Sequence, residues 1–384
     1  PSRYAAFLAN VQLSEEVRED MPVGRTHLWD ELVPLFLHHP ELFERTDRKA
    51  KKYIARNAMS RQNRLYGTNA NVKPAIEKGF SPVRNFRDRY NEKTWNTTGE
   101  LMAERYKTRH SACRYCSILC GHKGHYPDGR MRQIPEYETT GMFGSNIENY
   151  DPDLIGIWNE KMNELGIDTI SAGGTIAWAM EAAEKGMRKS ELRFGQSGNI
   201  EKILEDIAYR RGEGDELAEG SMRLSREYGG SDFAIHVKGL ECAAYDPRAS
   251  WGHGLGYAVY NKGGCHLGYY MIALEQLVGY MPPHTTAGKA AWVVFMENIY
   301  AAVNSLQLCQ FAVYGIIMEP PIPRLLPKPA LRSAGWKEDR GPEGRGIVAR
   351  SAMPHRQLDP CRGTRFGLRQ GRAALLPLSR SGHG

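Results

Sequence analysis

The sequence has no long apolar run, little cysteine and no internal repeat, and each of these absences excludes a class of protein. The longest mostly apolar stretch, residues 290–303, is interrupted by Glu297 and Asn298, so we expect no membrane-spanning helix. Seven cysteines in 384 residues are too few for a small secreted domain held together by disulfides. Helical and strand patterns do not alternate, which argues against a parallel α/β sheet.

A uniform excess of positive charge is also missing, although the net charge is +7. Residues 320–384 contain 13 Lys and Arg but only 4 Asp and Glu, whereas the rest of the chain carries 38 basic and 40 acidic side chains. The body of the protein is therefore not basic, and we expect no nucleic-acid partner. Residues 320–384 also hold nine prolines and nine glycines, and we interpret them as a tail that is either disordered or translated out of frame.

Helical periodicity dominates the remainder, and 41% hydrophobic residues suffice for two domains with cores. Helices are predicted at residues 10–60, 153–165, 175–185, 200–210, 265–276 and 287–308. Gly166 and Gly186 would end two of them, and Asn199 would cap a third. Glycine and proline predict irregular structure at residues 66–95 and 229–265. The expected fold class is mainly α, with one helical domain segment at residues 1–150 and a second at 151–319.

Three cysteines lie within eight residues, in the pattern C-x2-C-x3-C from Cys113 to Cys120. On a helix, this spacing would place the sulfurs on one face, where three thiolates could converge on one centre. Clustered thiolates select an iron–sulfur cluster or zinc. Three interpretations stay open at this point: an iron–sulfur cluster, a zinc knuckle completed by His122 or His125, and thiols without a metal.

A four-iron cluster usually takes its fourth cysteine from a distant part of the chain. Cys309 follows an apolar helix that could carry it to the cluster, and it is the first candidate. Cys242 and Cys265 remain alternatives.

Several further segments, together with the cysteine run, resemble tungsten-containing aldehyde:ferredoxin oxidoreductases in residue content and order. They are residues 135–139 (PEYET), 163–170 (NELGIDTI), 238–241 (KGLE), 244–248 (AYDPR), 264–267 (GCHL) and 305–309 (SLQLC). The resemblance covers roughly residues 60–319, and the coincidence of separate motifs is far more specific than any one of them. The resemblance implies the two helical domains of that family, without its amino-terminal β domain and without its carboxyl-terminal helices.

The resemblance further implies a tungsten ion held by two pterins, beside one [4Fe–4S] cluster. The implied cluster ligands are Cys113, Cys116, Cys120 and Cys309. The implied pterin-binding residues are Asn163, Gly166, Asp168, Asn304 and Leu308. Asn163 and Asn304 stand where the family has aspartate, Ile167 replaces a leucine, and Gln307 replaces a glycine. Glu138 and His266 are implied as the catalytic residues that handle protons beside the metal.

The implied activity is oxidation of an aldehyde to a carboxylic acid, with electrons leaving through the cluster to ferredoxin or to an iron–sulfur partner subunit. A cytoplasmic location goes with this activity, and assembly with like or unlike subunits stays open. The chain alone is expected to be inactive, because the β domain forms half of the pterin site in the family. Two alternative functions are a tungsten subunit of a dearomatising benzoyl-coenzyme A reductase and a zinc-stapled helical interaction module.

Overall fold

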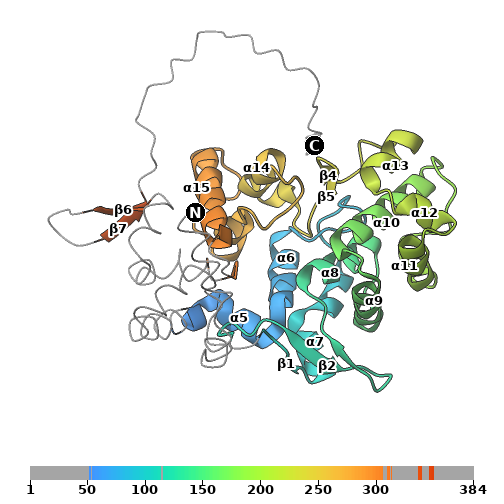
Figure 1. Cartoon of the computed structure of the whole chain (residues 1–384), viewed down its shortest axis with the longest axis horizontal. Helices are drawn as coiled ribbons and strands as arrows, with labels where there is room; N and C mark the ends of the chain where they lie inside the picture. The colour runs from blue at the N-terminus through green and yellow to red at the C-terminus, as the bar shows by residue number, and fades with distance from the viewer. Residues whose placement is uncertain are drawn as a thin grey trace, which may run out of the picture.

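The computed structural model describes residues 52, 54–113, 116–305, 309–311 and 313, and the backbone of residues 336–339 and 346–349. Most of the described chain is helical, which confirms the mainly α fold class (Figure 1). The helices predicted before residue 52 lie outside the described residues. In the basic tail, β6 (Trp336–Asp339) and β7 (Gly346–Ala349) form an antiparallel pair, and the rest of the tail lies outside the described residues.

The first part of the described chain combines short helices with a small antiparallel sheet of strand order β1-β2-β3. Its elements are α5 (Ala58–Tyr66), η1 (Gly67–Asn71), α6 (Val72–Lys78), η2 (Glu92–Thr97), α7 (Gly99–Tyr106), β1 (Arg109–His110), β2 (His122–His125), β3 (Met131–Gln133), α8 (Tyr137–Met142) and η3 (Ser145–Ile147). The cysteine run is the connection between β1 and β2.

The second part contains the longer helices, together with a short hairpin of β4 and β5. Its elements are α9 (Pro152–Leu165), α10 (Thr169–Glu184), α11 (Ile200–Tyr209), α12 (Glu213–Leu217), α13 (Ser221–Tyr228), β4 (His236–Val237), β5 (Leu240–Glu241), η4 (Pro247–Ala249), α14 (Trp251–Val259), the π-helix η5 (Ala273–Leu277) and α15 (Lys289–Ser305).

Helix α10 is the centre of the hydrophobic core, since all its residues from Ala172 to Ala182 are buried. Small residues allow its neighbours to approach closely: a Cβ on Gly173 would lie 2.7 Å from the Met142 Cβ, and one on Gly174 would lie 3.0 Å from Glu241. The same core includes residues on both sides of residue 150, such as Met142 and Trp158. The division into two helical domain segments at that residue stays a prediction.

Several predicted helices are confirmed, and the residues at their ends show which sequence signals start or stop each helix. Helix α9 ends at Gly166, whose φ of 70° is the left-handed conformation that glycine favours. Helix α10 begins at Thr169, earlier than the predicted residue 175, because the Asp168 side chain accepts a hydrogen bond from the Ser171 amide at 2.7 Å. The predicted cap at Asn199 is wrong, since its side chain makes no capping hydrogen bond to α11.

Two segments predicted to be irregular contain helices, α6 within residues 66–95 and α14 within residues 229–265. The glycines of α14 serve packing: a Cβ on Gly256 would lie 2.1 Å from the Tyr269 ring. The helix predicted at residues 265–276 begins only at Met271 and continues as the π-helix η5.

Asp151 caps the start of α9 with its side chain, whereas Asn199 makes no such hydrogen bond to α11, and this difference can be tested by stability measurements. The Asp151 side chain accepts a hydrogen bond from the Asp153 amide at 2.9 Å, so Asp151→Ala is expected to lower the free energy of unfolding by about 1 kcal/mol. Asn199→Ala is the matched control and is expected to cost only a few tenths of that amount. Urea unfolding of the two variants measures both values, and equal losses would contradict the assignment of the caps.

Candidate active site and cysteine centre

The described part of the cysteine run is a loop and not a helix, so the sulfurs are not placed by helical spacing there. In the described part of this loop, the Cys116 amide donates to the Cys113 carbonyl oxygen at 3.2 Å. The Cys116 sulfur accepts hydrogen bonds from the amides of Ile118 and Leu119 at 3.3 and 3.5 Å. Amide donors directed at sulfur stabilise negative charge there, as the thiolates of an iron–sulfur cluster require.

Cys309, distant in sequence, lies within electrostatic reach of this loop. Burial raises the pKa of the Cys120 thiol to about 12, and the neighbouring groups Glu136, Cys309, Cys116 and Cys113 add to the increase. Cys309 is exposed after the end of α15. Cys120 therefore lies within electrostatic range of the other three predicted cluster cysteines, although no three His, Cys, Asp or Glu side chains among the described residues are placed to hold a metal ion together. Their role as ligands stays a prediction.

The two alternative cysteines lie in other surroundings. Cys242 is buried, and burial followed by the charges of Glu241 and Asp246 raises the pKa of its thiol to about 12. Cys265 is half-buried, and its sulfur accepts a hydrogen bond from the Leu267 amide at 3.5 Å.

His122 does not face the thiols as a zinc ligand would. Its Nδ1 lies 3.0 Å from the Cys120 carbonyl oxygen and its Nε2 lies 3.0 Å from the Arg64 carbonyl oxygen. Both ring nitrogens therefore contact backbone oxygens, and the ring links α5 to the cysteine loop. Arg64 strengthens this link by donating to the Ser117 carbonyl oxygen at 2.5 Å. The zinc knuckle completed by His122 does not fit this geometry.

Glu138 and His266, the predicted catalytic residues, are brought together by the fold. Glu138 lies in α8, and its Oε2 accepts a hydrogen bond from the Ala244 amide at 2.7 Å. Its Oε1 lies 3.2 Å from Nε2 of His266, without the alignment of a hydrogen bond. Both side chains are largely buried, so their remaining polar atoms face an interior rather than bulk water.

Burial keeps both members of this pair neutral near pH 7. It raises the pKa of the Glu138 carboxyl to about 8, a shift to which Asp168 adds and which the Ala244 amide opposes. It lowers the pKa of His266 to about 3, and Lys262 adds to this effect. A carboxylic acid with a pKa near neutrality beside a neutral imidazole is an arrangement that can hold and exchange one proton.

Three buried tyrosines surround the pair. The Tyr245 ring centroid lies 5.4 Å from that of His266, and the Tyr245 hydroxyl lies 2.7 Å from the Tyr270 hydroxyl. Asn71 donates to both hydroxyls at 3.3 Å, and the Tyr137 hydroxyl donates to the Ala244 carbonyl oxygen at 2.6 Å. Tyr137 and Tyr245 lie in two motifs of the family resemblance, residues 135–139 and 244–248. Nothing in the sequence indicates that Asn71 or Tyr270 belongs to the site.

Asp246 and Arg248, in the motif at residues 244–248, hold a turn together. The two side chains form an ion pair at 2.6 Å, and Arg248 also donates to the carbonyl oxygens of Phe86 and Arg87. These contacts of Arg248 are structural: they hold the turn against the segment around residue 86.

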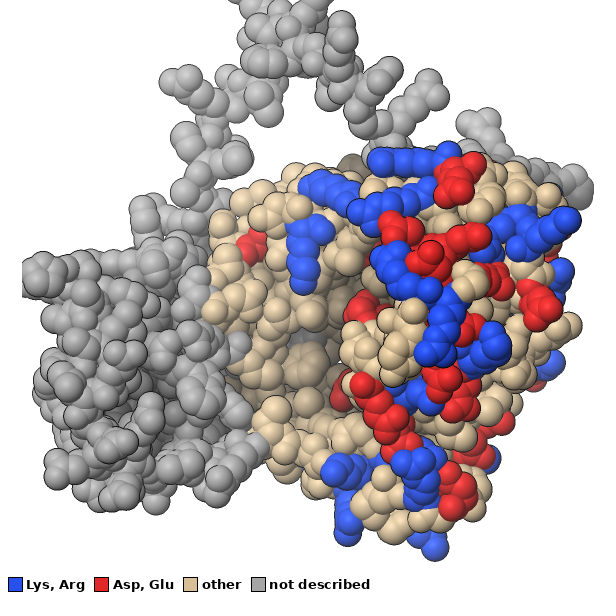
Figure 2. All heavy atoms as spheres, turned by 45° about the vertical axis from the view of Figure 1, so that its right-hand side comes forward, with Lys and Arg blue, Asp and Glu red and all other residues tan. Residues whose placement is uncertain are grey.

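The predicted pterin-binding residues lie on the surface where the structure describes them. Asn163, Gly166 and Asp168 are exposed at and after the end of α9, and Asp168 is close enough to Glu138 to influence its pKa. Asn304 is exposed on α15 and accepts a hydrogen bond from the Gln310 side chain at 3.3 Å. Leu308 lies outside the described residues. Figure 2 shows a hollow in the part of one face that carries few charged side chains.

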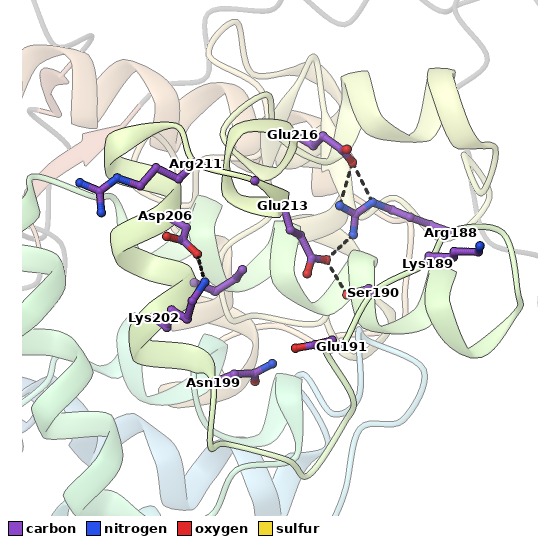
Figure 3. A pocket seen from close by; sticks show the side chains of 12 residues that line it. Arg188, Lys189, Ser190, Glu191, Asn199, Lys202, Asp206, Arg211, Glu213 and Glu216 are labelled. Atoms are coloured by element: carbon purple, nitrogen blue, oxygen red, sulfur yellow. Dashed lines mark hydrogen bonds and ion pairs between the residues drawn. The ribbon is translucent and has the colours of Figure 1, made fainter.

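A different hollow, of about 620 Å³, lies between α11, α12 and the segment around residue 188 (Figure 3). Arg188 forms ion pairs there with Glu213 at 2.5 Å and Glu216 at 2.8 Å, and Lys202 pairs with Asp206. None of the predicted site residues lines this hollow. Most of its charged side chains pair with one another, so it fits a surface ion-pair network better than a ligand site.

The family whose sequence pattern matches the chain is described as "Aldehyde ferredoxin oxidoreductase, domains 2 & 3", and the match covers residues 45–334. The chain belongs to this family. The tungsten-containing aldehyde ferredoxin oxidoreductase of Pyrococcus furiosus is 40% identical over 262 residues, which are 65% of this chain and 43% of that protein. The corresponding protein of Thermococcus kodakarensis is 39% identical, with the same coverage. The chain thus spans less than half the length of these aldehyde ferredoxin oxidoreductases.

A solved structure also shares the fold of this chain. It is the active-site complex BamBC of benzoyl coenzyme A reductase with 1,5-dienoyl-CoA, at a TM-score of 0.53 and 18% identity, covering 71% of this chain and 50% of that chain. Family membership confirms the predicted resemblance and the helical fold class. Among the described residues, no helix is long and apolar enough to cross a membrane.

Proposed function

We propose that this chain supplies the helical part of a tungsten enzyme that oxidises aldehydes to carboxylic acids. The observation that carries the proposal is the Glu138–His266 pair, two largely buried groups 3.2 Å apart. Burial raises the pKa of Glu138 and lowers that of His266, so the carboxyl group has the higher pKa of the two, the reverse of the usual order. Removing two electrons from a hydrated aldehyde also releases two protons, and these need an acceptor at the site. Family membership and the tungsten relatives support the choice of reaction.

The residue types at the predicted positions suit the implied cofactors. Cys113, Cys116, Cys120 and Cys309 would hold a [4Fe–4S] cluster, and the amides directed at the Cys116 sulfur suit a thiolate ligand. Asn163, Gly166, Asp168, Asn304 and Leu308 would contact the two pterins. When bound, the tungsten-bispterin centre supplies the two-electron redox chemistry, and the cluster passes electrons to ferredoxin or a partner subunit.

Glu138 would exchange its proton through Oε1, because Oε2 is already engaged by the Ala244 amide. Nε2 of His266 lies next to that oxygen, so the neutral ring can accept the proton that the Glu138 carboxyl group carries while Glu138 takes up a proton from the substrate. The aromatic rings of Tyr245 and Tyr270 cover the pair and limit the access of water.

An activity assay separates this function from reduction of an aromatic thioester. A version of the chain extended to the full length of its relatives would be purified anaerobically with tungstate and assayed for dye reduction with aliphatic and aromatic aldehydes. The proposal predicts aldehyde-dependent turnover with the carboxylic acid as product. Turnover with a dienoyl or benzoyl thioester and none with aldehydes would contradict it and favour the benzoyl-coenzyme A reductase alternative.

Cys309 is expected to be indispensable for the cluster. Cys309→Ser should lose most of the iron and the brown absorbance of the anaerobically purified chain, because the cluster loses one of its four thiolates. Cys242→Ser and Cys265→Ser are the matched controls and should keep their iron. Iron content measured by mass spectrometry decides the question, and loss of iron in a control variant instead of Cys309→Ser would move the fourth ligand to that position.

A further inference from the structure

Two stretches of the sequence contain no acidic residue, and one of them carries the cysteine run. Residues 48–76 hold eight Lys and Arg, and residues 105–127, which include the cysteine run, hold five. Of the 38 basic side chains in residues 1–319, 13 therefore lie in these two stretches, which leaves 25 against 40 acidic ones elsewhere. The positive charge of the body of the protein is thus segregated rather than mixed with its negative charge.

The fold brings the two stretches together at the cysteine loop. Helix α5, in the first stretch, contacts the loop directly. Arg64 donates to the Ser117 carbonyl oxygen at 2.5 Å, and the Arg64 carbonyl oxygen lies 3.0 Å from Nε2 of His122. The second stretch contains β1 and β2, the strands that the loop connects (Figure 1). Both basic stretches therefore meet at the loop that carries Cys113, whose side chain is exposed.

Like charges lie directly opposite each other on the outer face of the small sheet. Arg109 of β1 and Lys123 of β2, here called the outer pair, are partners in the antiparallel register, and both side chains are exposed. Like charges in this position destabilise a sheet. Neither side chain forms an ion pair with a residue that the structure describes, and Arg109 instead donates to the Met131 sulfur at 2.9 Å. A repulsive pair without a counter-charge suits a surface that an anionic partner neutralises.

Other cations of the same region show that the fold can pair charges here. Arg132 of β3 is buried and forms ion pairs with Asp128 at 2.6 Å and with Glu160 of α9 at 2.9 Å. Arg105, near the end of α7, pairs with Asp153, which also lies in α9. The cations that face α9 therefore have carboxylate partners, in contrast to the outer pair.

We propose that the outer pair, with the exposed Lys107 and the adjacent cysteine loop, forms the docking surface for an acidic electron-carrier protein. This inference rests on the proposed function, in which electrons leave through the cluster that the loop would hold. Electron transfer between proteins slows steeply with distance, so a carrier must dock close to this loop. Opposite charges on the two partners speed and orient such encounters. Each docked carrier takes up one electron, so two oxidised carriers are reduced for each aldehyde oxidised.

Binding to the full 384-residue chain tests the surface without requiring catalysis. The probe is an oxidised [4Fe–4S] ferredoxin with an acidic surface, titrated by calorimetry at low and at high salt. We expect binding that weakens as salt rises, and a Kd about tenfold higher for Arg109→Gln/Lys123→Gln than for the unaltered chain. The absence of ferredoxin binding would overturn the proposal. Tighter binding of a DNA oligonucleotide than of ferredoxin would also overturn it, because the partner would then be a nucleic acid.

The matched control is Lys189→Gln/Arg211→Gln, which removes two exposed cations at the hollow of Figure 3. Its Kd for ferredoxin should equal that of the unaltered chain, and equal weakening by the two double variants would overturn the proposal. Carbodiimide crosslinking locates the contact independently, because it joins lysines to carboxylates that touch them. We expect ferredoxin to be joined to Lys107 and Lys123, whereas crosslinks at Lys189 instead would overturn the proposal.

Lys123→Glu separates docking from stability. It places an anion opposite Arg109, so the midpoint of thermal unfolding should not fall. Ferredoxin binding should nevertheless weaken more than in Lys123→Gln, because a repulsive charge then faces the acidic partner. A Lys123 with only a structural role would lose stability and binding together, and that result would overturn the proposal.

A version extended to the full length of the relatives distinguishes failure of this inference from failure of the proposed function. Aldehyde-dependent reduction of ferredoxin is compared with that of a small uncharged dye. We expect Arg109→Gln/Lys123→Gln to lower kcat/KM for ferredoxin about tenfold and to leave reduction of the dye unchanged. Equal loss with both acceptors would overturn the inference. Salt-dependent ferredoxin binding without any aldehyde-dependent dye reduction would count against the proposed function alone.

Discussion

Glu138→Gln in the full-length, metal-loaded enzyme is expected to lower aldehyde turnover by about 10²–10⁴-fold while tungsten and iron contents stay unchanged. Glutamine preserves the size of the side chain and can still accept the hydrogen bond from the Ala244 amide, so the fold around α8 should be retained. It cannot gain or release a proton at the atom that faces His266. The expected loss therefore reports on proton handling rather than on packing.

The control for this variant is Glu136→Gln, two residues earlier and outside the pair. Glu136 accepts a hydrogen bond from the Thr68 hydroxyl at 2.5 Å, and glutamine can accept it in the same way. The ratio of turnover in the two variants, measured at equal tungsten content, isolates the contribution of Glu138. Near-normal turnover of Glu138→Gln would make this residue a structural acid that caps the Ala244 amide.

Lys289→Met is expected to lower the free energy of unfolding by roughly 3–5 kcal/mol, since it leaves the buried carboxylate of Glu275 without its cation. Glu275 and Lys289 are both almost fully buried and form an ion pair at the start of α15. Lys289 also donates to the Pro282 carbonyl oxygen at 2.6 Å, and Glu275 accepts hydrogen bonds from Ser250 and from the Gly252 amide. This cluster joins η5 to α14 and α15, and the two helices lie side by side in Figure 1.

Two comparisons control this prediction. Lys202→Met removes an exposed partner of Asp206 and should cost far less stability than Lys289→Met, because solvent screens this ion pair. The double variant Glu275→Gln/Lys289→Met should recover much of the stability lost by Lys289→Met alone, because no unpaired charge stays buried. Denaturant unfolding measures all three. A loss for Lys289→Met no larger than that for Lys202→Met would contradict the importance of the buried pair.

Local signals in the sequence predicted those parts of the fold that depend on neighbouring residues. Gly166 ends α9 as predicted, because a left-handed residue at a helix end is a local requirement. Helix α14 was missed because its glycines resemble a loop, whereas they allow the Tyr269 ring to lie against Gly256. The early start of α10 was missed for a related reason: Gly173 and Gly174 weaken the helical pattern, but they fit against Met142 and Glu241 in the core.

In the candidate site, too, features set by neighbouring residues could be predicted from the sequence, whereas contacts between distant segments could not. The spacing of the cysteine run predicted a metal centre, which stays a prediction, and the loop conformation of its described part was not foreseen. The pairing of Glu138 with His266 came from the resemblance to a family, since nothing local in the sequence joins α8 to the loop before η5. The enclosure around the pair, including Asn71 and Tyr270, depends on packing between distant segments and left no signal in the sequence.

The most direct test of the central claim is metal analysis of the 384-residue chain purified without oxygen. All four predicted cluster ligands lie in this chain, so the account predicts iron at about four atoms per chain. It also predicts brown absorbance that bleaches on reduction, and loss of both in Cys309→Ser. Zinc at about one atom per chain with no iron would contradict the account, because it would assign the thiols of Cys113, Cys116 and Cys120 to a structural zinc site.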